Sequence, residues 1–455
     1  MDLDHDACYR AIELRDARFD GRFFTAVRTT GTYCRPVCPA RTPRSENVTF
    51  YPTAAAAQEA GFRPCLRCRP ETAPDKGAWR GTSNTVSRAL ALIELGALDE
   101  GSVDALAGRL GLGERQLRRL CRQHLGASPI AVAQTRRVLL AKQLIHETSL
   151  PMAEIAFAAG FGSIRRFNET FTELYGRAPC ALRRRGGPEI PAGPGGEISL
   201  LLRYQPPYDW PGMLECLRLH AVPGVERVVG SCYSRAIELD GRRGIVSVRP
   251  DAGNALRARI RFPRLSALPG IIARLRRVFD LAVDPLAICA HLAKDPALAP
   301  LVTARPGLRV PGAWDGFELA IRAVLGEEIS VTDAVRLAGR MVVAYGEPLT
   351  EPDHELTHAF PRAEVLARAD LTILGMPASR AATLSAVAAA VIADPEVLCG
   401  EPDAFPASDA GLARALAHLE GRRRSSRGLV ARAERWRPWR AYAAQYLWAS
   451  LRRGE

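Results

Sequence analysis

The spacing of apolar and polar residues divides the chain into a helical stretch, a stretch of strands and a helical end. From residue 83 to about residue 185, apolar residues recur at helical spacing, and the pattern repeats after about fifty residues. The first copy covers residues 103–112, the second covers residues 152–161, and a basic helix follows each. A short apolar helix, a glycine turn and a helix with outward polar residues predict a helix-turn-helix. We therefore expect two such units, joined by a long helix around residues 136–146.

A break rich in proline and glycine, residues 186–196, separates the helical stretch from the strands. After the break, the alternation of apolar and polar residues predicts strands over residues 197–204, 225–233, 245–248 and 256–260. The remainder of the chain is predicted to be helical. The expected fold is a multi-domain α+β protein, because a single core cannot serve 455 residues.

The charge balance and the scattered cysteines narrow the class of protein. The net charge is +13 and the pI is near 9.5, mostly from arginine, which favours nucleic acid over acidic small molecules as the partner. No apolar run approaches the roughly 20 residues that span a membrane, and residues 1–6 do not resemble a signal peptide. We therefore expect a cytoplasmic protein. Single cysteines are expected to be reduced thiols: Cys8, Cys121, Cys180, Cys216, Cys232, Cys289 and Cys399.

Four other cysteines occur as two closely spaced pairs. Cys34 and Cys38 form the first pair, a gap of 26 residues follows, and Cys65 and Cys68 form the second. This spacing predicts a tetrahedral zinc site in which each pair binds the metal from one turn. From spacing alone, a purely structural zinc site is the commoner interpretation. Flanking arginines suggest that a polyanion lies against the metal: Arg35, Arg41, Arg44, Arg63, Arg67 and Arg69.

The segments around these cysteines resemble the amino-terminal domain of the Ada DNA-repair regulators. The matching segments are residues 19–23, 27–31, 34–38, 46–48 and 60–68. In that family a zinc thiolate removes the methyl group from a methylated DNA phosphate. The resemblance implies that Cys34 is the nucleophile and that one Zn2+ is both structural and catalytic. It also implies that four residues contact the DNA backbone: Thr30, Arg41, Arg63 and Arg67.

Electrostatics explains how such a site would also act as a switch. Four thiolates on Zn2+ carry a net charge of about −2, so the sulfur atoms stay deprotonated and nucleophilic at neutral pH. A methyl phosphotriester is uncharged and can approach this cluster, whereas an ordinary phosphodiester is repelled. Transfer of the methyl group removes one negative charge from the cluster, so the expected result is tighter DNA binding.

The two helix-turn-helix units and the helix between them resemble the DNA-binding domain of the AraC family. Arginine and asparagine make bidentate contacts with guanine and adenine edges, so polar residues of each second helix are candidates for base recognition. An ordinary basic helical bundle is the alternative. An activator of this kind binds promoter DNA, and RNA polymerase is a further partner to consider. The candidates are Arg115, Gln116, Arg118 and Arg119 in the first unit and Ser163, Arg165, Arg166 and Asn168 in the second.

The second half of the chain, about 250 residues, resembles the AlkA-type DNA-3-methyladenine glycosylases. The matching segments include residues 203–210, 306–312, 318–325, 405–409 and 435–440. In that family an alkylated purine is flipped out of the duplex and its glycosidic bond is broken. The resemblance implies that Asp409 is the carboxylate that stabilises the sugar cation and that Trp448 lines the base pocket. Taken alone, Ser408 followed by Asp409 indicates a helix N-cap.

The glycosylase-like half departs from its family at two places. Roughly thirty residues are missing near residues 396–402, where the family has a helix-hairpin-helix that holds DNA phosphates. The family also has an uncharged wedge where this chain has Glu328, whose charge would lie between two phosphate chains. These departures predict that base excision is impaired. The alternative to a second enzyme is a regulator and methyl sensor whose glycosylase half is a non-catalytic remnant.

Two further segments and the domain boundaries complete the predictions. Residues 354–358 match the His-Glu-x-x-His pattern of zinc proteases, but Pro352 and Pro361 leave too short a helix for such a site. Residues 268–272 carry part of a Leu-Pro-Gly turn and are predicted to form a domain junction. The predicted domains are an Ada-like zinc domain over residues 1–75, an AraC-like domain over 76–186, an AlkA-like amino-terminal α+β domain over 197–285, and an all-α glycosylase-like domain without the hairpin over 286–455.

Overall fold

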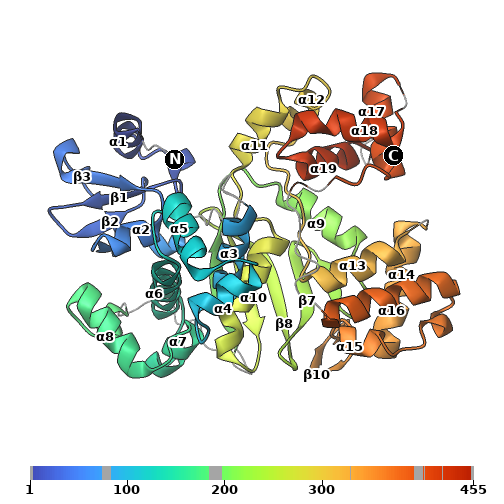
Figure 1. Cartoon of the computed structure of the whole chain (residues 1–455), viewed down its shortest axis with the longest axis horizontal. Coiled ribbons are helices and arrows are strands. Elements are labelled where there is room, and N and C mark those ends of the chain that lie inside the picture. The colour runs from blue at the N-terminus through green and yellow to red at the C-terminus, as the bar shows by residue number, and fades with distance from the viewer. Residues whose placement is uncertain are drawn as a thin grey trace. The chain divides into compact units, whose positions relative to one another are not determined.

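The computed structural model describes residues 4–73, 84–183, 197–327, 329–393, 403, 405–422 and 424–451. The chain divides into two compact units, whose elements are labelled in Figure 1. Unit 1 contains Met1–Gln205, Asp251–Arg276 and Leu281–Val283, and unit 2 contains Pro206–Pro250, Arg277–Asp280 and Asp284–Glu455. The predicted wedge residue Glu328 and the predicted deletion near residues 396–402 lie outside the described residues.

The first part of unit 1 is a small sheet with the strand order β3-β1-β2-β4. β1 pairs antiparallel with both β2 and β3, whereas β2 and β4 run parallel, with Tyr33 opposite Pro64. These two residues directly precede Cys34 and Cys65, so the parallel pair brings both cysteine pairs to the same end of the sheet. The elements are α1 (His5–Glu13), β1 (Phe24–Val27), β2 (Thr32–Cys34), β3 (Val48–Tyr51), α2 (Ala54–Glu59) and β4 (Arg63–Pro64).

The helices that follow confirm the two predicted helix-turn-helix units. The second helix of each unit ends at a glycine in the left-handed conformation, Gly126 at a φ of 70° and Gly176 at a φ of 66°. Glycine suits this position because a side chain would be strained there. The long helix α6 connects the two units, as the sequence predicted. The helices are α3 (Asn84–Glu94), α4 (Val103–Arg109), α5 (Glu114–Leu125), α6 (Pro129–Glu147), α7 (Met152–Ala158) and α8 (Ile164–Tyr175).

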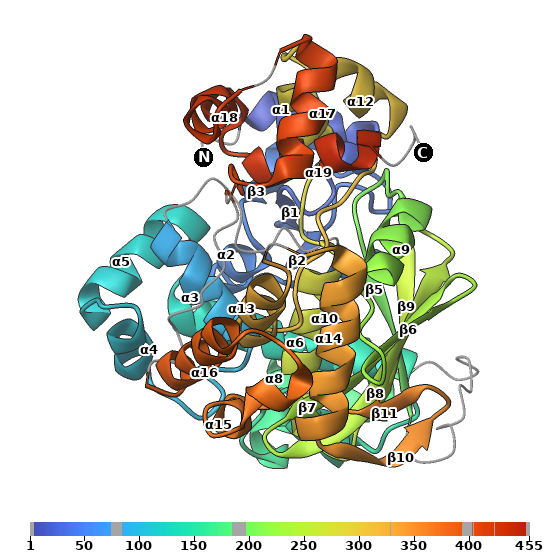
Figure 2. The same ribbon diagram turned by 90° about the vertical axis from the view of Figure 1, so that its right-hand side faces the viewer.

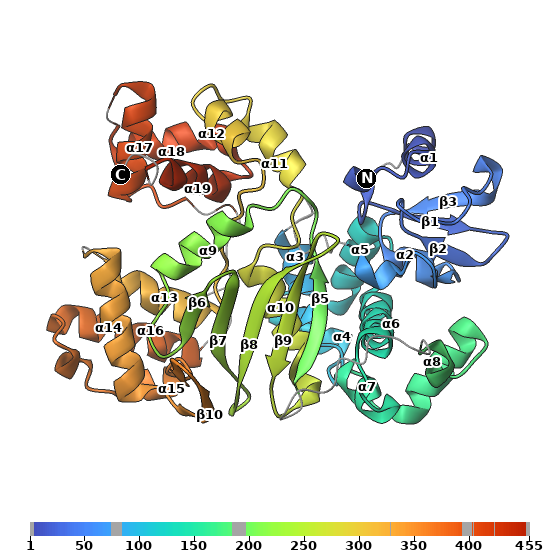
Figure 3. The ribbon, with the colours of Figure 1, turned by 180° about the vertical axis from the view of Figure 1, so that it is seen from behind.

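A five-stranded sheet has the order β5-β9-β8-β7-β6 (Figure 3). Each of the four predicted strand regions falls on a strand, but the prediction over residues 225–233 is wrong in extent, because the chain turns at Gly230 between β6 and β7. Residues 268–272 lie at the start of α10, and their assignment as a domain junction stays a prediction. The elements are β5 (Ile198–Arg203), α9 (Trp210–Leu219), β6 (Glu226–Val229), β7 (Cys232–Leu239), β8 (Arg242–Asp251), β9 (Ala255–Arg261) and α10 (Leu268–Val278).

The prediction of an all-helical end is wrong at one place in unit 2. The strands β10 (Pro348–Asp353) and β11 (Leu356–His358) form an antiparallel hairpin. His354 lies in its turn at a φ of 54°, so the His-Glu-x-x-His pattern is on a hairpin and not on the helix that a protease site requires. Leu349 and Leu356 are buried against β7 and β8, and this burial stabilises the hairpin.

In unit 2, the helices α13, α14, α15 and α16 pack around an apolar core, which includes Ile321, Leu325, Met341 and Leu384. Among the described helices, none has the length and apolar character needed to cross a membrane. The helices are α11 (Pro285–Leu292), α12 (Ala299–Ala304), α13 (Gly316–Leu325), α14 (Val331–Tyr345), α15 (Ala363–Leu366), α16 (Ala378–Ala393), α17 (Ala410–Glu420), α18 (Ser426–Ala433) and α19 (Arg440–Leu451), most of which Figure 2 shows from a second side.

Candidate metal centre and nucleic-acid interface

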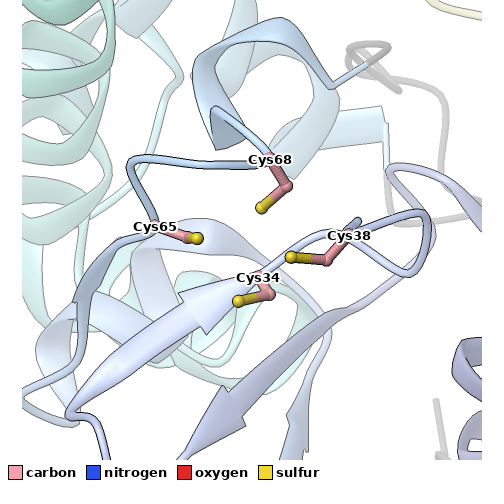
Figure 4. Close-up of side chains that lie close together, drawn as sticks. All are labelled: Cys34, Cys38, Cys65 and Cys68. Atoms are coloured by element: carbon pink, nitrogen blue, oxygen red, sulfur yellow. The ribbon is translucent and has the colours of Figure 1, made fainter. Parts of the chain in front are cut away.

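Four cysteine side chains point to a common centre at one end of the small sheet (Figure 4). Cys34 ends β2, Cys65 follows β4, and the loops that start there carry Cys38 and Cys68. Their sulfur atoms all lie within 4.8 Å of one another. Zinc–sulfur bonds of about 2.3 Å in a tetrahedron place the sulfurs about 3.8 Å apart, so the cluster fits one Zn2+. Within the described part of the chain, no other group of three or more His, Cys, Asp or Glu side chains is arranged to hold a metal.

The chemistry of the four sulfur atoms also fits a metal centre. Soft sulfur ligands in a tetrahedral arrangement favour zinc over cations that prefer oxygen. Hydrogen bonds among the thiols, above all the one between Cys34 and Cys38, raise the pKa of Cys34 and lower the pKa of Cys38 to about 7. These opposed changes arise because, within a hydrogen-bonded group of thiols, one sulfur keeps its proton and donates it to a neighbour that ionises. A divalent cation at the centre lets all four sulfurs stay deprotonated.

The four sulfur atoms differ in exposure and in hydrogen bonding. Cys34 and Cys38 are half-buried, whereas Cys65 and Cys68 are buried. Cys34 accepts no hydrogen bond from the described backbone. A thiolate without such bonds is less stabilised than a thiolate that accepts them. Backbone N–H groups donate to the two buried sulfurs: Arg35 to Cys68 at 3.4 Å and Arg67 to Cys65 at 3.4 Å. Cys34 is therefore more accessible than Cys65 and Cys68, and its charge is less stabilised than theirs.

Arg35 has an environment that the sequence did not indicate. Its guanidinium forms an ion pair with Asp20 and donates to the carbonyl oxygen of Cys68 at 3.2 Å and to Oγ1 of Thr72 at 2.6 Å. Only 13% of the Arg35 side chain is exposed, and Arg69 is also largely buried. These two arginines have buried partners within the protein: Arg35 ties together the loops around the cysteines, and Arg69 pairs with Glu71 and Glu147.

The residues predicted to contact the DNA backbone lie nearer the surface. Thr30, Arg41 and Arg67 are exposed, and Arg63 is half-buried. Oγ1 of Thr30 lies 2.7 Å from Oγ1 of Thr32, so its hydroxyl is already hydrogen-bonded at the edge of the sheet. Their contact with DNA stays a prediction.

On α5, three of the four predicted base-reading residues are exposed: Arg115, Gln116 and Arg119. Arg118 is half-buried, and its guanidinium lies 2.6 Å from the carboxylate of Glu114, one turn earlier. Arg118 would have to break its ion pair with Glu114 before it could bind a DNA base. It is therefore the least favoured of the four candidates for base recognition on α5.

On α8, Arg165, Arg166 and Asn168 are exposed. Ser163 lies at the N-cap, where its Oγ accepts a hydrogen bond from the N–H of Arg166 at 3.2 Å, so its hydroxyl has a structural function. Ile164 is 41% exposed, and the sequence analysis missed it. An apolar residue at this place can contact a thymine methyl group in the major groove. The sequence does contain a clue to Ile164, because it is an apolar residue that directly follows a helix cap and precedes polar residues.

The carboxylate of Asp409 lies next to the indole of Trp448, 39 residues further along the chain. Oδ1 of Asp409 accepts hydrogen bonds from Nε1 of Trp448 at 2.9 Å and from the N–H of Leu412 at 2.7 Å. Asp409 is the N-cap of α17, as Ser408 followed by Asp409 indicates. The structure thus brings together the two residues that the resemblance places at a base pocket. Their part in base excision stays a prediction.

Family models match three parts of the chain. The metal binding domain of Ada matches residues 7–71, a helix-turn-helix domain matches residues 106–185, and the AlkA N-terminal domain matches residues 199–315. Fold and site together define a class of protein in which a metal-binding Ada domain, a helix-turn-helix domain and a glycosylase-like body share one chain.

The chain belongs to the family of bifunctional transcriptional activator/DNA repair proteins. It is 41% identical over 484 aligned positions to the probable bifunctional transcriptional activator/DNA repair enzyme AlkA of Mycobacterium tuberculosis, and the alignment covers 99% of this chain and 97% of that protein. It is also 34% identical over 285 positions to DNA-3-methyladenine glycosylase 2 of Escherichia coli, covering 54% of this chain and 95% of the relative. The solved DNA methyl phosphotriester repair domain of E. coli Ada is 50% identical over 15% of this chain and 76% of that one, with a TM-score of 0.15.

The alignment with the mycobacterial relative bears on the predicted deletion. It spans 484 positions, whereas the chain has 455 residues, so at least 29 alignment positions have no residue in this chain. This shortfall has the size of the roughly thirty residues that the sequence analysis found missing from the glycosylase-like half. The position of the deletion stays a prediction.

Proposed function

We propose that Cys34 accepts the methyl group of a DNA methyl phosphotriester, once per protein molecule, and that this event switches the helix-turn-helix domain to activate transcription. The observation that carries the proposal is the four-sulfur cluster, in which Cys34 is half-buried and lacks the backbone hydrogen bonds that the buried sulfurs of Cys65 and Cys68 accept. Within the cluster, the zinc ion supplies the charge that keeps the sulfurs deprotonated.

The transfer balances without an additional reactant. The Cys34 sulfur uses an electron pair to form a bond with the methyl carbon, and the bond between that carbon and the phosphate oxygen breaks. The oxygen keeps the bonding pair, so the product is an ordinary phosphodiester anion and no proton moves. The negative charge that the cluster loses appears on the phosphate, and the thioether product has no route back.

The same charge change supports the regulatory half of the proposal. After transfer, the cluster repels neighbouring phosphates less, so the protein binds DNA more tightly. The exposed residues of α5 and α8 would then read the promoter, and RNA polymerase is the proposed partner there. Transcription reconstituted with purified polymerase tests this partner, since methylated protein should stimulate it more than unmethylated protein.

Mapping of a labelled methyl group tests the acceptor. After incubation with DNA that carries a labelled methyl phosphotriester, the label should be on the peptide that contains Cys34. Replacement of Cys34 by Ser should abolish transfer, whereas Cys180→Ser, which changes an exposed cysteine outside the cluster, should leave it unchanged. Label on any other residue, or no label at all in wild-type protein, would refute the assignment.

The hydrogen bond between Asp409 and Trp448 favours base excision as a second function. We propose that excision is slow, because a deletion of the helix-hairpin-helix would remove backbone amides that hold DNA phosphates. Release of 3-methyladenine from alkylated DNA is the measurement. Release well above spontaneous loss that disappears in Asp409→Asn would show an active glycosylase. Release equal to spontaneous loss would support a regulator with a non-catalytic remnant.

A further inference from the structure

The fully buried Lys142 on α6 is the strongest feature that the proposed function does not use. The chain has 62 lysine and arginine residues, of which only three are lysines: Lys76, Lys142 and Lys294. The exposed fraction of the Lys142 side chain is 0%. Its Nζ donates to the carbonyl oxygen of Cys65 at 2.9 Å and to Oε2 of Glu71 at 2.7 Å. A buried ammonium group is thus held against the loop that carries two of the four cysteines.

Glu71, which follows shortly after Cys68, also connects the metal loop to α6 through Arg69. Nε of Arg69 donates to Oε1 of Glu71 at 2.9 Å, and its NH2 group lies 3.4 Å from Oε1 of Glu147. Only 1% of the Glu71 side chain and 9% of the Glu147 side chain are exposed. A buried charge is costly to leave unpaired, so these alternating charges favour one arrangement of loop and helix. We call the side chains of Glu71, Arg69, Lys142 and Glu147 the α6 junction.

The same helix also contacts strand β5. Nε2 of Gln143 donates to the carbonyl oxygen of Leu201 at 2.9 Å, and Oε2 of Glu147 accepts from the N–H of Leu201 at 3.0 Å. β5 is an edge strand, so these side chains satisfy backbone groups that no further strand pairs with. Helix α6 is therefore held at two places, by the metal loop and by β5. A change at the metal loop alters one of these two attachments.

We propose that the contact between Lys142 and Glu71 is the route by which alkylation of Cys34 acts on the helix-turn-helix units. The proposal rests on the methyl transfer proposed above. Both the negative cluster and Glu71 attract the ammonium group of Lys142, and methyl transfer removes one negative charge from the cluster. The attraction weakens, and the metal loop holds α6 less firmly. Because α6 connects both helix-turn-helix units, their placement on DNA changes.

The side-chain type and the surroundings of Lys142 support this route. Lysine is a compact point charge with rotatable donors, whereas an arginine binds as a rigid planar fork, so the contacts of Lys142 are less fixed in geometry. Burial lowers the pKa of Lys142, and the negative charges of Glu71 and Cys68 act against this change. Nζ of Lys142 is fully buried and donates to the carbonyl oxygen of Cys65, so the charge of the cluster acts on it with little screening by water.

Replacement of Lys142 by Met tests the route, because it keeps an unbranched side chain only one atom shorter and removes the charge. A DNA duplex selected from a random library by methylated wild-type protein serves as the probe, and a duplex with one methyl phosphotriester serves as the methyl donor. We expect Lys142→Met to bind zinc and to take up the methyl group as wild type does. Its gain in DNA affinity on methylation, at constant salt, should be at least about fivefold smaller than that of wild type.

The matched control is Lys294→Met, which removes an exposed lysine charge and should keep the full gain. A full gain in Lys142→Met would overturn the proposed route while leaving the methyl acceptor intact. If wild-type protein took up no methyl group, both proposals would fail, so the two failures are distinguishable.

A second measurement uses wild-type protein alone and does not depend on how the variant folds. Reductive methylation of lysines, followed by peptide mass spectrometry, compares Lys142 with the exposed Lys294. Before methyl transfer, Lys142 should be protected, and after transfer its labelling should increase several-fold while that of Lys294 stays constant. Equal protection of Lys142 before and after transfer would contradict a loosened α6 junction.

Discussion

At the scale of single residues, burial separates side chains that the sequence presents as equivalent. Arg35 and Arg67 each follow a cysteine closely, yet the Arg35 guanidinium is buried against Asp20 and Arg67 is exposed. The first holds the loops in place and the second remains available to DNA. Likewise, Cys34 and Cys65 have similar sequence contexts, but only Cys65 accepts a backbone N–H and is buried.

Replacement of Arg35 by Met should destabilise the zinc domain strongly. Asp20 would lose its partner at a site where only 8% of its side chain is exposed, and a buried charge left unpaired costs about 3–5 kcal/mol. Zinc release to a chelator, followed by absorbance, measures the effect. Arg67→Met, at an exposed position, should change the free energy of unfolding by less than about 0.5 kcal/mol. Equal zinc release from the two variants would show that the ion pair has no structural role.

Asp280 in unit 2 should make stability depend on pH. Burial raises the pKa of Asp280 from 3.8 to about 6, although Arg309 and hydrogen bonds from Tyr442 and Val310 act in the opposite direction. The folded state therefore binds this proton more tightly than the unfolded state. The resulting stability is complete below about pH 4 and is lost as the pH rises through about 6, and the shift corresponds to roughly 3 kcal/mol at most.

Asp280→Asn isolates this effect because asparagine stays neutral. Relative to wild type, the variant should gain about 1–3 kcal/mol in the free energy of unfolding between pH 4 and pH 7.5. Denaturant titrations of both proteins across this range give the difference. A difference that does not change with pH would mean that Asp280 titrates alike in the folded and unfolded states.

At the scale of elements, caps and turns place the second helices of the helix-turn-helix units. The turn before α8 depends on Gly160, which has a φ of 90° and whose missing Cβ would lie 2.5 Å from the carboxylate of Asp99. Arg136 and Arg137 of α6 bind the same carboxylate. The Asp99 carboxylate thus pairs with the connecting helix and lies directly against the turn of the second helix-turn-helix unit, where only glycine leaves room for it.

Gly160→Ala should therefore weaken the second helix-turn-helix unit. The left-handed conformation costs a side chain about 1–2 kcal/mol, and displacement of the Asp99 carboxylate adds to this cost. Gly162→Ala is the matched control, since nothing lies within 4 Å of the Cβ it adds. Thermal unfolding and promoter binding should be impaired in the first variant only. Equal behaviour of the two variants would contradict the packing described here.

At the scale of the whole molecule, the parts differ in what stabilises them. The apolar clusters of the zinc domain are small, with Phe24, Ala26, Tyr33 and Ala57 in one of them, whereas the helices α13, α14 and α16 of unit 2 share a large core. A small domain with little buried apolar surface depends on its metal for stability. The two units therefore need not respond together when zinc is removed.

Removal of zinc should unfold residues 4–73 selectively. Hydrogen exchange measured after chelation should show loss of protection in β1, β2 and β3, while α13 and α14 keep theirs. The physical reason is that four uncompensated thiolates repel one another where the metal had joined two loops. Loss of protection throughout unit 2 at the same chelator concentration would show that the two units unfold as one.

The sequence by itself determined the features that depend on local spacing. Paired cysteines predicted the zinc cluster, and the repeated pattern of apolar residues, glycine turn and basic helix predicted both helix-turn-helix units. Such features are readable because a few neighbouring residues decide them: ligands on one turn, or a glycine that ends a helix. The strands of the five-stranded sheet followed in the same way from alternation, whereas the strands of the zinc domain and the β10–β11 hairpin were not predicted.

Only the tertiary structure decided which distant residues meet. The hairpin β10–β11 forms because burial of Leu349 and Leu356 against the sheet outweighs local preference, and no spacing in the sequence reports that burial. Likewise, nothing near Lys142 in the sequence places its ammonium group on the carbonyl of Cys65, or the indole of Trp448 on Asp409. These contacts depend on how whole elements pack, so each side chain's surroundings are set by residues far along the chain.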